Sequence, residues 1–270
     1  MLSAVLNGKR RGTGFAGKQL ALGDTSGAED VLTATVFERL AYLPDLLLET
    51  FFDRFLGLDE PPGPLTEIQF WPSWYMAGTR VEPDVVLQGS ERSLLVEAKR
   101  HDHGLQQYAQ QLARELVAGT CSGELRRPVL LTLGGLPEYT GAAAGQLGAQ
   151  IDAVLGDTSL DYELVCRSWS HLYLALESTV ATAPADSRPG LFRLLEDIAA
   201  TYAWHGLRTH PQRWLVQLGR AGIRATTCPL GGAFSAAAPS PPVLNHSLAG
   251  LPAPGLTRAS FPPAIWSLRP

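Results

Sequence analysis

The sequence predicts a mixed α/β fold, in which a β-sheet is flanked by helices and followed by a helical C-terminal part and a tail. Three observations support this fold class. Apolar residues recur at helical spacing before residue 57, short β-rich runs occupy residues 66–98, and helix-like and strand-like segments alternate after that. The order strand, hairpin, helix, strand is typical of a sheet with both antiparallel and parallel strands.

Two helices are predicted first. The first covers residues 29–40, where apolar side chains recur at helical spacing, and the pair Ser26 and Glu29 matches a capping box. The second begins after Pro44 and ends near Gly57, because proline favours a helix start and glycine a helix end.

Short strands follow a loop over residues 59–64, where three prolines and a glycine interrupt regular structure. The β-rich runs cover residues 66–71, 83–88 and 93–98. Only four residues separate the last two runs, so they are expected to form an antiparallel hairpin.

The remaining elements alternate between helix and strand. A helix over residues 104–117 is followed by a buried strand over 128–133. The further expected elements are a helix, a strand and two helices, at residues 142–155, 162–166, 172–179 and 191–205.

The predicted organisation is one main domain between two less regular ends. Residues 1–25 combine glycines with four basic residues, which indicates a flexible basic arm. Residues 26–228 form the main domain, whose helical part starts at about residue 167. Residues 229–270 are rich in Ala, Pro and Ser with hardly a charge, so we expect a disordered tail.

Composition narrows the class of protein. The net charge of -4 argues against a chain coated in basic residues, so a nucleic-acid contact would need a local patch. Three cysteines far apart support neither a disulfide framework nor a Cys-rich zinc site, which fits a reducing cytoplasm. No apolar run has the length of a signal peptide or a membrane span, so no membrane partner is expected.

The residues that carry chemistry stand at one end of the predicted hairpin. Asp84 begins its first strand, Glu97 lies near the end of the second, and Lys99 follows on the same face as Glu97. Because the strands run antiparallel, Asp84 can approach Glu97 across the hairpin. Two carboxylates with room for water suit Mg²⁺, and the lysine can hold a water or stabilise charge developing on phosphorus. The alternative is a solvated Glu97–Lys99 pair at a strand edge, although the apolar run before it predicts a buried strand.

The arrangement Pro83-Asp84 followed by Glu97-Ala98-Lys99 resembles the PD-(D/E)XK nuclease superfamily. The resemblance implies a restriction-endonuclease-like fold, with Asp84 and Glu97 as metal ligands for Mg²⁺, which Mn²⁺ can replace. It covers roughly residues 29–133.

The resemblance also implies two further site residues. Members often place a glutamate on the first helix to complete the metal shell; Glu29 is the candidate here and Glu38 the runner-up. RecB-like members add a glutamine on the helix after the lysine, for which Gln111 is the candidate and Gln107 the next. The RecB-like pattern continues Gln-x-x-x-Tyr, whereas Glu115 stands at that spacing here.

The expected function is therefore metal-dependent hydrolysis of phosphodiester bonds in DNA, in phage defence, restriction or repair. The alternative is a catalytically inactive module that binds nucleic acid or protein on a nuclease scaffold. DNA or RNA, single or double strands, and endo or exo cleavage stay open. A homodimer is compatible with either function.

Overall fold

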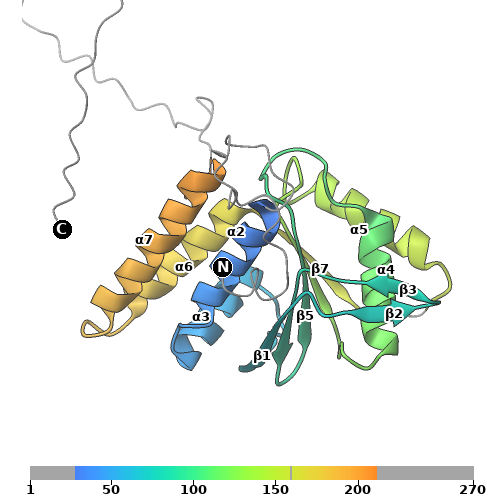
Figure 1. Cartoon of the computed structure of the whole chain (residues 1–270), viewed down its shortest axis with the longest axis horizontal. Coiled ribbons are helices and arrows are strands. Elements are labelled where there is room, and N and C mark those ends of the chain that lie inside the picture. Colours follow the sequence, from blue (N-terminus) through green and yellow to red (C-terminus); the bar gives the residue numbers. More distant parts are fainter. Residues whose placement is uncertain (1–27, 159, 212–270) are drawn as a thin grey trace, which may run out of the picture. The chain divides into compact units, whose positions relative to one another are not determined.

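The computed structural model describes residues 28–158 and 160–211, and within them a five-stranded mixed sheet lies between two layers of helices (Figure 1). The strand order is β1-β4-β5-β6-β7. β1, β4 and β5 pair antiparallel, whereas β5, β6 and β7 pair parallel. This arrangement confirms the expected mixed α/β class. The basic arm, Ser26 of the capping box and the Ala/Pro/Ser-rich tail lie outside the described residues.

The sheet strands follow the β-rich runs of the sequence within two residues at each end. β4 and β5 form the expected antiparallel hairpin, with Val85 paired to Val96. The strands are β1 Leu65–Phe70, β4 Val85–Gly89, β5 Ser93–Ala98, β6 Val129–Leu133 and β7 Glu163–Arg167.

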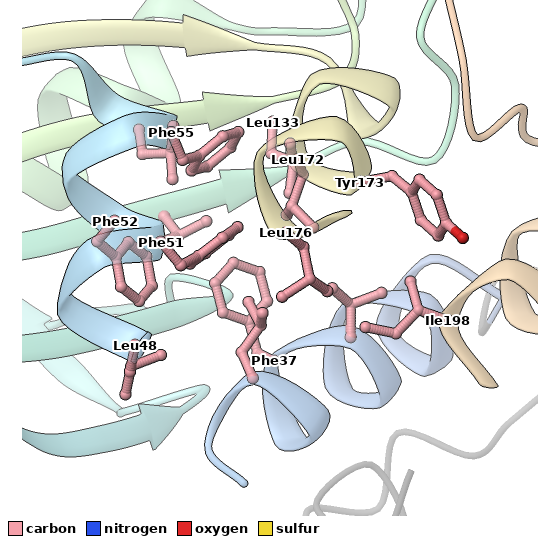
Figure 2. Packing of buried hydrophobic residues seen from close by; sticks show 14 of the residues in the cluster. Phe37, Leu48, Phe51, Phe52, Phe55, Leu133, Leu172, Tyr173, Leu176 and Ile198 are labelled. Atoms are coloured by element: carbon pink, nitrogen blue, oxygen red, sulfur yellow. The ribbon is translucent and has the colours of Figure 1, made fainter. Parts of the chain in front are cut away.

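Four helices cover one face of the sheet. Their apolar side chains, with every second residue of β4, β5 and β6, form the larger core cluster. Figure 2 shows Phe51 and Phe55 on the side of α3 that faces Leu172 and Leu176 of α6. The two phenylalanine rings are stacked at a centroid distance of 5.4 Å. These helices are α2 Ala28–Leu40, α3 Asp45–Leu56, α6 Trp169–Thr182 and α7 Arg188–His205.

The opposite face carries α4 (Ala109–Cys121), α5 (Ala142–Leu155) and a small hairpin (Figure 1). The alternate strand residues Val86, Leu95 and Leu130 pack there against both helices. Glu97 shares its side of β5 with Leu95, so its side chain faces the layer that contains α4.

Two details differ from the sequence predictions. α4 begins at Ala109 rather than at Gly104, whose φ of +100° is incompatible with a right-handed helix. The small hairpin of β2 (Trp74–Met76) and β3 (Thr79–Val81) was not predicted. Its strands are too short for a period of two to be recognised.

Candidate active site

The site lies where β4 begins and β5 ends. Extending the β4–β5 register by one residue beyond Val85 and Val96 places Asp84 opposite Glu97. Asp84 Oδ2 accepts a hydrogen bond of 2.9 Å from the Ala98 amide, which fixes the carboxylate across the hairpin. The expected approach of Asp84 to the end of β5 is confirmed.

Lys99 points at Glu97 from two residues further along. Its Nζ donates to Glu97 Oε1 at 2.5 Å, and only 3% of the Glu97 side chain and 14% of the Lys99 side chain are exposed. A solvated pair at a strand edge is therefore the wrong interpretation. The pair is enclosed, and charges without water require partners.

The first helix contributes Glu29. Its Oε2 accepts a 2.8 Å hydrogen bond from the Arg100 amide, and its Oε1 lies 3.6 Å from Lys99 Nζ. Glu38 stands nine residues later, which is about 14 Å further along the helix axis. Of the two candidate glutamates, the structure brings Glu29 to the site.

The helix α4 supplies the glutamine. Gln111 Nε2 donates to Glu97 Oε1 at 2.7 Å and to Glu115 Oε1 at 2.9 Å. Gln107 instead donates to backbone carbonyls, at 3.1 Å to Gly134 and 3.4 Å to Glu97. The structure therefore places Gln111 against the carboxylates. Gln107 lies two residues before α4 and not on the helix, and it ties the chain leading into α4 to the ends of β5 and β6.

Glu115 is a site residue that the sequence analysis treated only as a departure from a pattern. It is 2% exposed and shares a helix face with Leu112 and Ala118, which are also buried. The sequence signal for Glu115 was a glutamate inside the apolar stripe of an amphipathic helix. Burying a carboxylate costs free energy, so this position indicates a functional or paired glutamate.

Burial perturbs the acids of the site. It raises the pKa of Asp84 to about 6, an effect that the nearby charge of Glu29 increases, and it raises the pKa of Glu115 to about 7. The pKa of Glu97 is raised well above its ordinary value by burial and by the charges of Asp84 and Glu115. Burial alone would lower the pKa of Lys99, but the Glu97 carboxylate outweighs it and the pKa lies above its ordinary value. Lys99 is thus an ammonium at neutral pH.

The donor set of the site fits a hard divalent cation. Within the described residues, no three His, Cys, Asp or Glu side chains are arranged as a ready-made metal cage. However, Glu97 Oε2 and Glu115 Oε2 are buried and have no hydrogen-bond partner in the described part of the chain. Mg²⁺ commonly uses only one or two protein carboxylates, with water and phosphate oxygens as its other ligands. The unpartnered oxygens, together with Asp84, offer such a set.

The segment after β5 is held by α6. The Trp169 indole donates to the Lys99 carbonyl at 2.7 Å, and the Trp169 amide donates to Asp102 Oδ1 at 2.7 Å. Gly134 permits this close approach, because its φ is +74° and a Cβ there would lie 2.2 Å from the Lys99 oxygen. The backbone that carries the lysine is therefore fixed from both sides.

An open groove of about 410 Å³ leads to the site between β3 and α4. Gln111 and Glu115 lie in its wall, so the groove reaches the α4 side of the site. Arg80 in this groove bonds to Ser73 and forms an ion pair with Glu82. The lining is Arg80, Val81, Glu82, Tyr108, Gln110, Gln111, Arg114 and Glu115.

Comparison with known proteins finds a clear sequence relative and a weak structural resemblance. No family model matches the chain. The uncharacterized protein PM0110 of Pasteurella multocida (strain Pm70) is 40% identical over 233 residues, which span 85% of this chain and 90% of that protein. The crystal structure of the protein of unknown function AF1548 aligns with a TM-score of 0.30 and 13% identity, over 64% of this chain and 99% of the other.

No helix in the described ranges is long and apolar enough to cross a membrane.

Proposed function

The chain belongs to the same family as the uncharacterized protein of Pasteurella multocida, and we propose that it is a metal-dependent nuclease of the PD-(D/E)XK type that hydrolyses phosphodiester bonds in DNA. One observation carries the proposal. Asp84, Glu97 and Lys99 meet at the end of a buried hairpin, and Glu97 keeps a buried oxygen without a hydrogen-bond partner among the described residues. In a purely structural ion pair, a buried carboxylate oxygen without a partner only costs free energy. At a cation site, the same oxygen can serve as a metal ligand.

Asp84 and Glu97 hold the cation in this proposal, with Glu29 beside them. A bound Mg²⁺, or Mn²⁺ in its place, polarises the phosphodiester and lowers the pKa of a water. Gln111 orients Glu97 by donating to Oε1, which leaves Oε2 for the cation. Glu29 fixes the first turn of α2 against the end of β5 through the Arg100 amide.

Lys99 acts as a hydrogen-bond donor and not as a base. Its raised pKa keeps the ammonium protonated at neutral pH, so it has no lone pair with which to accept a proton from water. Its Nζ can donate to the oxygen on which charge develops as the phosphorus is attacked, an effect of about 10²–10³ in rate for one such donor.

The groove beside the site supports nucleic acid as the substrate. Arg114 provides a guanidinium group for phosphate oxygens, and Tyr108 is 64% exposed at the start of α4, where a base can stack on it. Arg80 adds a second guanidinium group that is paired with Glu82. The sparse cysteines favour a reducing cytoplasm as the location in this proposal, and a homodimer would let two sites cut both strands.

The direct experiment incubates the full-length protein with supercoiled plasmid, linear single-stranded DNA and an RNA of matched length. Each substrate is tested with Mg²⁺, with Mn²⁺ and with chelator. Asp84→Asn removes one ligand charge and keeps the shape, and its amide oxygen can still accept from the Ala98 amide. Asp197→Asn is the matched control, because Asp197 is 63% exposed and pairs with Arg39 on the helical layer.

We expect cleavage of DNA that needs the metal, is lost in Asp84→Asn and is unchanged in Asp197→Asn. Absence of cleavage on all three substrates by the wild-type protein would contradict the proposal. DNA binding without cleavage in that case would favour the inactive binding module instead.

A further inference from the structure

Another open groove, with a volume of about 440 Å³, lies at the C-terminal end of β7. Its walls come from the end of α3, from α6 and from the loop before α5. Arg54 of α3, Arg167 of β7 and His171 of α6 line it, and no aspartate or glutamate of the described residues does. This β7 groove also contains the hydroxyl groups of Tyr139, Thr140 and Ser178.

The two arginines of the β7 groove are held only by uncharged groups. Arg54 donates a hydrogen bond of 2.8 Å to the Ser178 carbonyl. Neither arginine forms an ion pair with a carboxylate in the described part of the chain. Because a guanidinium has five N–H donors, both side chains keep N–H groups that no described residue accepts. Arg167 donates to three backbone carbonyls, those of Phe55, Leu56 and Cys166.

Helix capping explains the position of these arginines but does not balance their charge. The C-terminal end of a helix carries about half a negative charge, whereas the two guanidinium groups bring two positive charges to the end of α3. Burial lowers the pKa of Arg167, because its charge is partly withdrawn from water. The surplus positive charge therefore favours an anion in the β7 groove.

His171 adds an imidazole to the two guanidinium groups. Its side chain forms no hydrogen bond with the other described residues, and its ring contacts the Tyr139 ring edgewise at a centroid distance of 6.5 Å. Burial and the charge of Arg167 lower the pKa of His171, and Asp102 opposes them. Both carboxylate oxygens of Asp102 already accept hydrogen bonds from backbone amides at the start of α6. His171 is therefore neutral at pH 7 with one N–H to donate, and a bound anion would raise its pKa.

The β7 groove is separate from the carboxylate site, although both lie at the same edge of the sheet. Arg167 pairs with Leu133 on β6, and Leu133 pairs with Ala98 on β5. Two strand spacings, or about 10 Å, therefore separate the backbone of Arg167 from the end of β5. A group bound in the β7 groove is thus a different group from one held at the carboxylates.

We propose that the β7 groove binds a phosphate group through Arg54, Arg167 and His171. Arginine presents paired N–H groups that match two phosphate oxygens, and the Thr140 and Ser178 hydroxyls can donate to the others. The phosphate belongs either to a nucleic-acid backbone or to a free small molecule, and both sources present the same chemistry. This inference goes beyond the proposed nuclease activity, because phosphate binding in this groove needs neither a metal nor cleavage.

The test follows the His171 ring by NMR in the full-length protein, in chelator and at constant ionic strength. Inorganic phosphate is exchanged for chloride, and the His171 signal is identified by its absence in His171→Gln. Arg54→Gln removes a charge from an exposed side chain, whereas Arg54→Lys keeps the charge without the paired N–H groups. Arg193→Gln is the matched control, because Arg193 is an exposed arginine on α7 that does not line the groove. Thermal unfolding verifies that each variant folds.

Phosphate should shift the His171 signal to saturation, and raise its pKa, in the wild-type protein and in Arg193→Gln. The affinity for phosphate should fall about tenfold in Arg54→Gln and by less in Arg54→Lys, because a charge-assisted hydrogen bond is lost or weakened. An unchanged His171 signal in the wild-type protein would contradict the inference. Equal affinities for phosphate in the wild-type protein and Arg54→Gln would also contradict it.

A second titration identifies the source of the phosphate with short fluorescein-labelled single-stranded DNA, again in chelator. If the groove holds a backbone phosphate, Arg54→Gln binds this DNA more weakly, and the slope of log affinity against log salt falls by about one. An unchanged DNA affinity, in a variant that has lost inorganic phosphate, assigns the groove to a free phosphorylated molecule. Phosphate binding by a protein that cuts no nucleic acid would support this inference and contradict the proposed nuclease.

Discussion

Both ends of the β4–β5 hairpin contain buried charged side chains. At the turn end these charges are compensated by partners of opposite sign, and at the other end they are not. At the turn end, the guanidinium of Arg92 donates to the carbonyls of Glu60 and Arg127 and to the carboxylate of Glu163. Arg127 forms an ion pair with Glu60. Positive and negative groups alternate there, and Arg92 is tied to three separate segments of chain.

At the other end, carboxylates outnumber cations and two of their oxygens have no hydrogen-bond partner among the described residues. Lys99 forms ion pairs with Glu97 and Glu29, while the carboxylates of Asp84 and Glu115 remain as surplus negative charge. The turn end shows that buried charges in this hairpin can be fully compensated by neighbouring side chains. The surplus negative charge at the other end therefore indicates a site for a ligand rather than a defect of packing.

The largest expected effect is on cleavage by Glu97→Gln. This substitution removes a carboxylate that holds the proposed cation, and we expect a loss of at least about 10³-fold in cleavage rate, since metal activation contributes several kcal/mol. Lys99 also loses its buried partner, so the metal-free variant should be less stable than the wild-type protein in urea, and cleavage is measured where the variant is folded. Retained activity in the variant would remove Glu97 from the proposed mechanism.

A pH series separates the surplus carboxylates from the rest of the protein. Burial raises the pKa of Asp84 to about 6, above its value in the unfolded chain, so the folded protein binds more protons and loses this stability as pH rises through 6. His205 acts in the opposite direction, because burial lowers its pKa to about 4. The measurement therefore compares wild type with Asp84→Asn in chelator.

At pH 3, below the ordinary pKa of an aspartate, the two proteins should have similar free energies of unfolding. At pH 8 the wild-type protein should be less stable than Asp84→Asn, by an amount on the order of 2–3 kcal/mol. A difference that does not change between pH 3 and pH 8 would show that Asp84 carries no surplus charge.

At the turn end, removing a buried charge should destabilise the protein. Arg92→Met removes a buried guanidinium that donates to three acceptors, so we expect the free energy of unfolding to fall by about 2–3 kcal/mol. Its effect should not depend on metal, as urea unfolding with Mg²⁺ and with chelator can measure. A metal-dependent loss of stability in this variant would break the distinction between the two ends.

The smallest effect is expected for Glu60→Gln. Glu60 and Arg127 form an ion pair whose side chains are both more than half exposed, so water screens the charges. The free energy of unfolding should change by no more than about 0.5 kcal/mol. A loss above about 1.5 kcal/mol would mean that this exposed pair, and not only Arg92, holds the turn end together.

The sequence predicts those parts of the fold and site that depend on local patterns. The approach of Asp84 to Glu97 follows from strand alternation and a short turn, both of which operate within twenty residues. Glu29 and Gln111 came from the resemblance, and the structure brings both to Lys99 and Glu97.

The parts that could not be predicted depend on tertiary packing. The apolar face of α4 indicates that Glu115 is buried, but not what it lies against. Its place beside Gln111 and Glu97 depends on the rotation at which α4 packs on the sheet, and no local pattern specifies that angle. The β2–β3 hairpin turns through Ala77 and Gly78, both with positive φ, and lacks the Asn-Gly or Asp-Gly pair that would have marked it.

The most direct measurement compares DNA cleavage rates in Mg²⁺ for the wild-type protein, Lys99→Met and Arg92→Met, each at a temperature where it is folded. The account predicts a loss of about 10²–10³-fold for Lys99→Met and an unchanged rate for Arg92→Met. Equal rates for Lys99→Met and the wild-type protein would contradict the claim that the carboxylate-rich end of the hairpin is the active site.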